Sequence, residues 1–176
     1  MNIAILTNPK QYPYHISISQ MINTILTEHA HSIYLLDINS EKYDYQCLAK
    51  LNAFEPDVII TLDLAGFRFR TQSEESALNM LFTKNLNILW GNKPEYQPLL
   101  NRKISLSMLF YDASGTDYGL PLLYPNMLYY KAAKPLPVFS ASNGEASPDI
   151  SRDPESAAAF LEIWHDFLKE ALLSEA

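Results

Sequence analysis

Short apolar runs alternate with helical periodicities along the first two thirds of the chain. Continuous runs of Val, Ile and Leu are typical of strands covered on both faces, whereas apolar residues three and four positions apart are typical of amphipathic helices. The apolar runs predict five strands, at residues 2–7, 32–38, 57–64, 86–90 and 105–111. The helical spacing predicts helices at residues 16–30, 40–51 and 77–82, and a short helix at 94–100.

Strands that alternate with helices in this way predict an α/β fold with right-handed crossovers. We therefore expect a Rossmann-like or flavodoxin-like three-layer sandwich around a mainly parallel, five-stranded sheet. The alternation ends after Tyr111, where glycines and prolines punctuate about forty residues, too many for an ordinary connection. A final helix is predicted from Pro154, because Asp153 can cap it and aromatic and aliphatic residues follow at helical spacing.

These segments predict three parts of the chain. Residues 1–134 form a parallel α/β domain, and residues 135–153 form an extended loop or linker. Residues 154–176 form an amphipathic helix that docks either on this domain or on a partner.

The composition excludes several classes of protein and several kinds of binding partner. The 176 residues match one ordinary domain, and 48% apolar residues can form a core. A net charge of −7 disfavours non-specific binding to nucleic acid. The single cysteine, Cys47, excludes an intrachain disulfide framework, and the apolar runs are too short to cross a bilayer. We expect a cytoplasmic location, with no nucleic-acid partner and no membrane partner.

Candidate ligand residues follow the first predicted strand. In an open parallel sheet, ligands bind outside the carboxyl ends of the strands, near the point where the strand order reverses. The loop at residues 8–15 has no glycine-rich phosphate motif, but it offers Asn8, Lys10, Tyr14 and His15. The alternative is a rigid turn whose tyrosines pack on the following helix.

A second candidate segment follows the most apolar strand and contains Asp63, Gly66, Arg68 and Arg70. Gly66 permits a positive φ or the close approach of a ligand. If this segment is extended, both guanidinium groups lie on one side and can clamp a phosphate or a carboxylate. The alternative is that the arginines form ion pairs with neighbouring acids on a solvated surface.

A third candidate segment, Gly91, Asn92 and Lys93, links the fourth strand to a predicted helix start, which favours anions. The alternative there is a plain turn with a helix cap.

The middle of the chain carries a surplus of basic residues, so an acidic small molecule would bind there rather than near the acidic C-terminal part. The histidines do not converge, and nucleophile and metal-ligand motifs are lacking. The sequence therefore predicts no metal site and no cofactor.

One family resemblance adds to this interpretation. Pro56-Asp57 opens an apolar strand that leads to Gly66, and after one helix comes a strand that ends in Trp90-Gly91. This succession resembles the N-terminal domain of GT-B glycosyltransferases, above all the bacterial spore-maturation-like group, over about residues 1–130. In that family the C-terminal domain, for which 176 residues leave no room, holds the donor sugar nucleotide. The N-terminal domain faces the acceptor.

The resemblance implies an acceptor-side surface on the three candidate loops and assigns no catalytic residue. The first functional hypothesis is therefore a non-catalytic domain that binds a small anionic or sugar-like ligand, or a partner protein such as a glycosyltransferase. One alternative is a stand-alone flavodoxin-like transferase or hydrolase that acts on a nucleotide or a phosphorylated substrate. Another is a homo-oligomeric assembly module that associates through the final helix.

Overall fold

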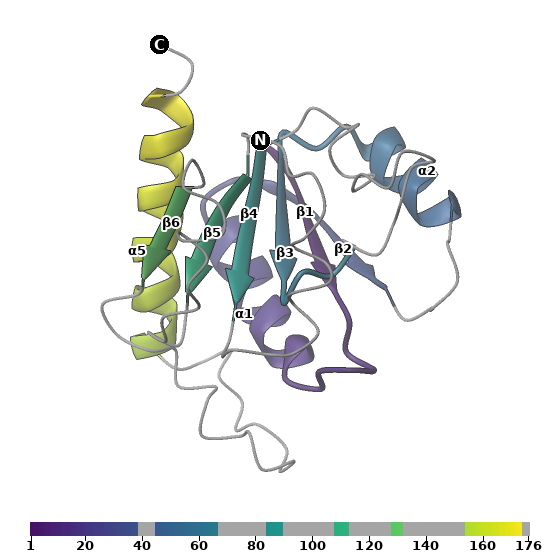
Figure 1. The fold of residues 1–176 in the computed structure, drawn as a ribbon, viewed down its shortest axis with the longest axis horizontal. Coiled ribbons are helices and arrows are strands. Elements are labelled where there is room, and N and C mark those ends of the chain that lie inside the picture. Colours follow the sequence, from purple (N-terminus) through teal and green to yellow (C-terminus); the bar gives the residue numbers. More distant parts are fainter. Residues whose placement is uncertain (39–44, 67–83, 90–107, 113–127, 132–153, 174–176) are drawn as a thin grey trace.

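The computed structural model describes residues 1–38, 45–66, 84–89, 108–112, 128–131 and 154–173 (Figure 1). Six strands form one sheet with the order β2-β1-β3-β4-β5-β6, and every neighbouring pair is parallel. The strands are β1 (Asn2–Thr7), β2 (Ser32–Asp37), β3 (Val58–Leu62), β4 (Lys84–Leu89), β5 (Met108–Asp112) and β6 (Leu128–Lys131). The helices are α1 (His15–Glu28), α2 (Tyr45–Phe54) and α5 (Pro154–Leu173). The predicted α/β class with a parallel sheet is confirmed.

Two details of the predicted strands are wrong. The third strand ends at Leu62, because the backbone of Asp63 and Leu64 turns into the left-handed region with φ of 49° and 60°. The sequence pattern predicts no strand at Leu128–Lys131, because four residues between proline-rich segments are too short for a recognisable pattern. The sheet therefore has one strand more than the five predicted. The predicted helices at 77–82 and 94–100 lie outside the described residues.

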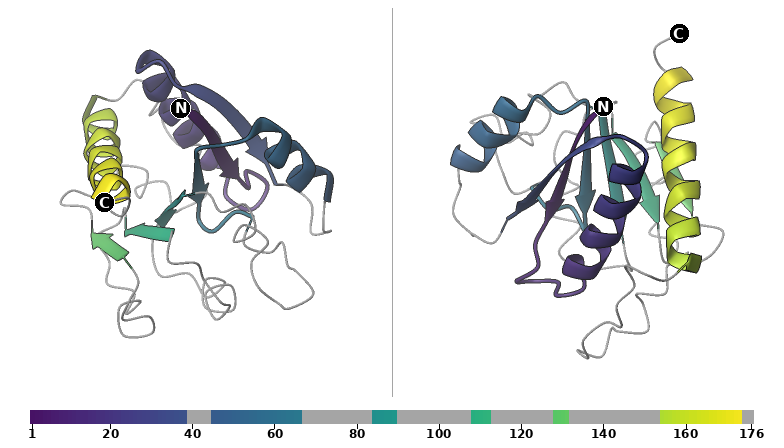
Figure 2. Two further views of the ribbon diagram at one scale, coloured as in Figure 1. Left: turned by 90° about the horizontal axis from the view of Figure 1, so that it is seen from above. Right: turned by 180° about the vertical axis from the view of Figure 1, so that it is seen from behind.

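The two faces of the sheet are covered by different helices. Helices α1 and α5 lie side by side on one face (Figure 2). Side chains alternate between the faces along a strand, so Ile33 packs toward α1 whereas its neighbour Tyr34 points to the other face. There the Tyr34 ring lies 5.3 Å from the ring of Phe54 in α2. A complete three-layer sandwich stays a prediction.

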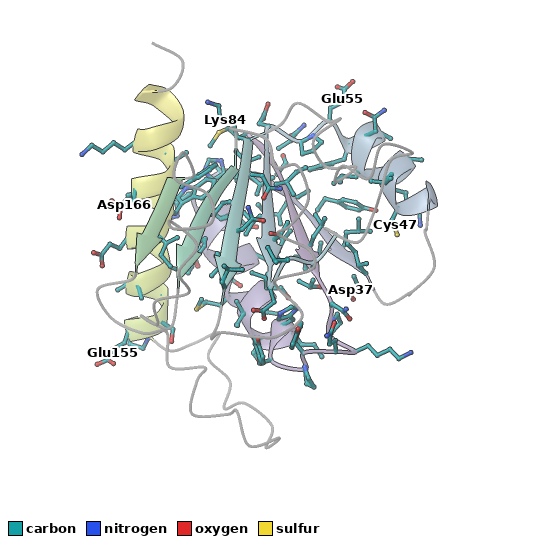
Figure 3. The ribbon with its side chains drawn as sticks, viewed as in Figure 1. Asp37, Cys47, Glu55, Lys84, Glu155 and Asp166 are labelled. Atoms are coloured by element: carbon teal, nitrogen blue, oxygen red, sulfur yellow. The ribbon has the colours of Figure 1, made fainter. Side chains whose placement is uncertain are left out.

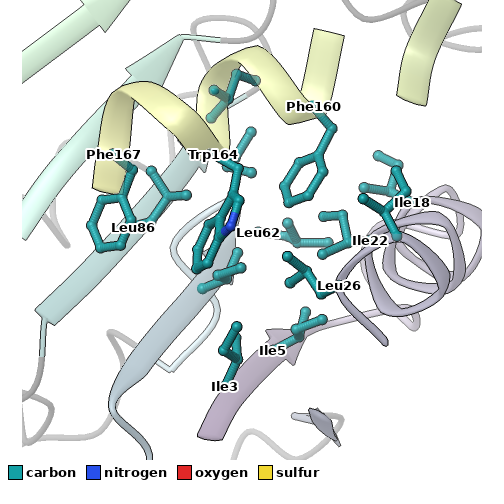
Figure 4. Packing of buried hydrophobic residues seen from close by; sticks show 14 of the residues in the cluster. Ile3, Ile5, Ile18, Ile22, Leu26, Leu62, Leu86, Phe160, Trp164 and Phe167 are labelled. Atoms are coloured by element: carbon teal, nitrogen blue, oxygen red, sulfur yellow. The ribbon is translucent and has the colours of Figure 1, made fainter. Parts of the chain in front are cut away.

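One continuous apolar core joins α1, α5 and the sheet (Figure 4). Helix α1 contributes the stripe of apolar residues that the sequence predicts, at positions 18, 21, 22, 25 and 26. Helix α5 contributes Phe160, Ile163, Trp164 and Phe167, all at most 2% exposed. The Trp164 ring stacks between the other two aromatic rings, with centroids 6.5 Å from Phe160 and 5.6 Å from Phe167. The apolar stripe of the last helix is therefore buried against this chain's own sheet.

The second face of the sheet carries a polar stripe. Thr61 on β3 donates a hydrogen bond to the side chain of Asn87, its register partner on β4. Asn85 lies two residues earlier on the same face and is 1% exposed. Both polar atoms of its amide lack a hydrogen-bond partner among the described residues, a costly arrangement in an apolar interior. The apolar pattern of these two strands does not predict the stripe.

Helix α1 ends in a Schellman motif built on an alanine. The Ala30 N–H donates to the Thr27 carbonyl at 3.0 Å, and the His31 N–H donates to the Leu26 carbonyl at 3.1 Å. This pattern requires a left-handed residue, and Ala30 supplies it with φ of 62°. Glycine usually occupies this position, because a Cβ in the left-handed region clashes with the following carbonyl.

We expect Ala30→Gly to raise the free energy of unfolding by about 1 kcal/mol, because it removes this strain. Urea denaturation measures the change. The matched control is Ala158→Gly at an exposed position inside α5. There glycine is expected to lower stability by about 1 kcal/mol. Equal destabilisation by both substitutions would contradict the proposed strain at Ala30.

His31 links the end of α1 to helix α5. Its ring meets the Trp164 ring edge-on, with centroids 5.9 Å apart. Burial lowers the pKa of His31 below its ordinary value of 6.5, and the nearby N-terminal ammonium and His29 lower it further. The folded chain therefore favours the neutral ring, and protonation favours unfolding.

This lowered pKa predicts a pH-dependent stability. The contribution of His31 to the free energy of unfolding is complete above pH 6.5, its pKa in the unfolded chain. It is lost as the pH falls through the lower pKa of the folded chain. His31→Phe keeps an aromatic ring against Trp164 and is expected to flatten the fall in melting temperature below pH 6.5. Gln20→Ala, at an exposed position on α1 without a titrating side chain, is the control and should leave the profile unchanged. An unaltered profile in His31→Phe would refute this role.

Candidate functional site

The strand order reverses direction at β1. The chain passes from β1 to β2 on one side and then returns to β3 on the other side of β1. All strands are parallel, so their C-terminal ends meet along one edge of the sheet, called here the carboxyl edge (Figure 1). The point between β1 and β3 is where open α/β sheets bind ligands, because the connecting loops diverge there. Two of the segments predicted from sequence, 8–15 and 63–66, lie at this point.

The loop that leaves β1 is a compact turn closed by Asn8. The Asn8 carbonyl accepts a hydrogen bond from the Tyr12 N–H at 2.9 Å, and its side-chain oxygen accepts one from the Gln11 N–H at 3.2 Å. The Asn8 amide nitrogen donates to the Gln11 side chain at 3.2 Å. The Asn8 side chain is thus committed to the turn, and Lys10 at its tip is exposed to solvent.

Asp63 connects this loop to the end of β3. Its side chain is fully buried, and one carboxylate oxygen, Oδ2, accepts hydrogen bonds from the Tyr14 hydroxyl and from His15 Nε2, the latter at 2.8 Å. The Asp63 N–H donates to the Ile88 carbonyl at 2.9 Å and so joins the turn to β4. We call Asn8, Tyr14, His15 and Asp63 the Asp63 network. It joins the ends of two strands that are adjacent in the sheet but far apart in sequence.

The hydrogen bonds of His15 fix its tautomer. The Asn8 backbone N–H, which can only donate, lies 2.9 Å from His15 Nδ1, so Nδ1 must accept. The ring proton of neutral His15 therefore sits on Nε2 and points to the Asp63 carboxylate. His15 is fully buried, and both ring nitrogens are occupied. A general base needs an available lone pair, so in this arrangement His15 positions the loop rather than moving protons.

The backbone after β3 is strained. Asp63 and Leu64 both have positive φ, and the Ala65 N–H donates to the Leu62 carbonyl at 3.0 Å, which closes a tight turn of the type I′ kind. Non-glycine residues in this region each cost about 1–2 kcal/mol. Gly66 completes the turn with φ of 89°, in agreement with the positive φ predicted for this glycine. The hydrogen bonds to Asp63 and the burial of Leu64 hold this turn in place.

The rings of Tyr14 and His15 in the Asp63 network pack against each other and against the ring of Tyr12. The Tyr12 ring lies 5.1 Å from the His15 ring and 5.9 Å from the Tyr14 ring, in tilted arrangements. The Tyr14 and His15 rings meet edge-on at 5.0 Å. Such packing restricts the rotamers of all three side chains. The loop therefore has the packed tyrosine rings that the alternative prediction describes, and its use as a ligand-binding surface stays a prediction.

A second carboxylate lies on the other side of β1. Asp37 is the last residue of β2 and the register partner of Thr7, whose buried hydroxyl donates a hydrogen bond to Asp37 Oδ1. The Ile38 N–H donates to the Thr7 carbonyl at 2.7 Å and continues the strand pairing past Asp37. Figure 3 shows Asp37 at the carboxyl edge, while Glu55 and Lys84 lie at the opposite edge. Asp37 is exposed to solvent.

The candidate residues from the sequence fall into three groups. Asn8, Tyr14, His15 and Asp63 come together, whereas Lys10 lies exposed on the same loop and Gly66 is buried in the turn after β3. The remaining candidates, Arg68, Arg70, Gly91, Asn92 and Lys93, lie outside the described residues.

Two residues at this edge, Thr7 and Asp37, are not among the candidates predicted from the sequence. Asp37 could be recognised from the sequence as an acidic residue at the end of a strand. Its place beside β1, however, follows only from the strand order, which the sequence does not determine.

Within the described ranges, no group of three or more His, Cys, Asp or Glu side chains is arranged to hold a metal ion. Among the same residues, no helix is both long enough and apolar enough to span a membrane.

No protein-family model, curated protein or solved structure matches this chain. The functional argument therefore depends on the fold and on the geometry of the carboxyl edge.

Proposed function

We propose that this chain is a non-catalytic binding domain that holds a small polar ligand at the carboxyl edge, between β1 and β3. The observation that carries the proposal is the buried Asp63 network at the reversal point of the strand order. A buried, hydrogen-bonded carboxylate and a strained turn are costly, and such features concentrate at functional sites. They give the loop at residues 8–15 a fixed shape, which lowers the entropy lost on binding.

The occupied ring nitrogens of His15 support a binding role over a catalytic one. The flavodoxin-like alternative, an enzyme acting on a nucleotide or a phosphorylated substrate, needs cationic groups at the edge. Lys10 is the one basic residue in the described part of the loop at 8–15, and the arginines of the second candidate segment would have to supply the rest.

We further propose that the chain is related to the N-terminal half of GT-B glycosyltransferases, as a three-layer sandwich in the cytoplasm. The single cysteine fits a reducing compartment. Under this proposal the carboxyl edge corresponds to the acceptor-side surface. An assembly module that associates through α5 is less favoured, because the apolar stripe of that helix is already packed against the sheet.

A thermal-shift panel of nucleotide sugars, nucleosides, simple sugars, nucleotides and flavins tests the proposal with the full chain. A ligand at one hundred times its Kd stabilises by about 2.7 kcal/mol, which raises the melting temperature of a chain this size by about 5–10 °C. We expect such a rise for at least one of these compounds, without its chemical conversion. No shift with any of these compounds would contradict a small-molecule site, and turnover would contradict a non-catalytic role.

The Arg68→Ala and Arg70→Ala variants separate the two functions. A shift specific to nucleotides that both variants abolish, but that the exposed-site control Lys50→Ala retains, would favour the enzyme. A shift that survives both substitutions would favour binding through the loop at residues 8–15.

A further inference from the structure

The side chain of Asp37 is a pre-organised hydrogen-bond acceptor at the carboxyl edge, because a hydrogen bond from Thr7 fixes the orientation of its carboxylate. Its Oδ1 atom accepts a hydrogen bond from Thr7, which is 1% exposed, while the Asp37 residue itself is exposed to solvent. The buried partner restricts the rotation of an exposed side chain, so the carboxylate loses little freedom when a ligand binds. The loop that begins at Asn8 follows Thr7 directly, so Asp37 flanks the reversal point.

We propose that Asp37 binds two adjacent hydroxyl groups of a sugar-type ligand, an inference that rests on the proposed function and names its ligand class. An ionised carboxylate accepts about four hydrogen bonds and donates none. Thr7 uses one of these positions, which leaves capacity for two hydroxyl donors. Hydrogen bonds to a charged acceptor are stronger than neutral ones, so a vicinal diol can be recognised through this side chain alone.

Among the described residues, the charges at the carboxyl edge favour a neutral ligand. An anion would meet the negative charge of Asp37 and, on the other side of β1, that of Asp63. A cation would meet Lys10 on the loop between them. A sugar ring avoids both repulsions, and its apolar face can lie against an aromatic ring such as Tyr12, which is half-buried at this loop.

Isothermal titration calorimetry of the full chain tests this inference with two matched pairs, uridine against 2′-deoxyuridine and glucose against 2-deoxyglucose. We expect at least one parent compound to bind, and its deoxy analogue to bind at least tenfold more weakly. This comparison uses the unaltered chain, so it does not depend on the folding of a variant. Inorganic phosphate and 1,4-diaminobutane are the anionic and cationic probes, and both are expected to bind more weakly than the sugar compounds.

The Asp37→Asn variant keeps an acceptor for Thr7 and removes the charge. We expect it to bind the parent compound at least tenfold more weakly and to lose the discrimination against the deoxy analogue. Asp57→Asn is a matched control, because Asp57 is an exposed acid at the opposite edge whose carboxylate also accepts one hydrogen bond, from the Asn2 N–H at 2.7 Å. It should bind like the unaltered chain.

Four results would overturn the inference. Equal affinity for parent and deoxy compounds, or unchanged binding in Asp37→Asn, would remove Asp37 from the site while leaving the proposed binding function intact. Tighter binding of phosphate or the diamine would replace the ligand class with an ionic one. A lack of binding by every probe would refute the inference, and only an additional lack of any shift in the thermal panel would refute the proposed function as well.

Discussion

Replacing Phe160 by alanine is expected to lower the free energy of unfolding by about 3–5 kcal/mol, the usual cost of emptying a buried phenylalanine site. Phe160 is 0% exposed, and its neighbours in the core come from α1, α5 and the sheet. The rigid elements on all sides cannot collapse into the space, so the cavity persists. A loss of this size is a large share of the total stability of a domain.

Guanidinium chloride denaturation of the full chain measures this loss. His165→Ala, at an exposed position on the same helix, is the control and is expected to change stability by less than about 0.5 kcal/mol. If α5 instead served to join two copies, Phe160→Ala would alter the molecular mass in solution and leave the unfolding of the single chain nearly unchanged. That outcome would contradict the packing of α5 on its own sheet.

Replacing Asp63 by alanine is expected to lower the free energy of unfolding by about 2–4 kcal/mol. The substitution leaves the buried His15 N–H and the Tyr14 hydroxyl without this acceptor, and each buried unsatisfied group costs about 1–3 kcal/mol. It also places alanine at a φ of 49°, where aspartate is better tolerated. The melting transition should broaden or shift downward, and the amide signals of the loop at residues 8–15 should change in a ¹H–¹⁵N spectrum.

Asp63→Asn separates the acceptor from its charge. Asparagine tolerates the left-handed backbone, and its oxygen can accept both hydrogen bonds, so we expect about half of the loss that alanine causes. Asp57→Ala at the opposite edge is the matched control and should cost less than about 1 kcal/mol, because its single hydrogen bond is exposed. A loss below about 0.5 kcal/mol for Asp63→Ala would contradict the role of the Asp63 network in holding the loop.

The strands and helices that the sequence predicts well are those with a strong apolar pattern. The first strand has its predicted bounds, Asn2–Thr7, and the last helix begins at Pro154 as predicted. Periodicity succeeds in these cases because burial on one face or both faces determines the residue types. It fails at Asp63 and Leu64, where an apolar pattern continues although the backbone turns. Tertiary contacts with Tyr14 and His15, which no local pattern contains, stabilise that turn.

The candidate site is predictable only as far as the strand order can be assumed. The general rule for parallel sheets selects the loop at residues 8–15 and the segment after β3, and the structure places Asn8, His15 and Asp63 together. The roles of these residues are not predictable, because the tautomer of His15 depends on a backbone N–H seven residues earlier in the chain. Asp37 becomes a candidate only once β2 is known to pair with β1.

Chemical-shift mapping tests the central claim, that the ligand binds at the carboxyl edge, most directly. The ¹H–¹⁵N spectrum of the full chain is recorded during titration with the compound that gives the largest thermal shift. The account predicts that the amide signals of Asn8, Ile38 and Asp63 move, while those of Asn2, Asp57 and Lys84 at the opposite edge stay in place. Movement confined to the opposite edge, or to the exposed surface of α5, would contradict the account.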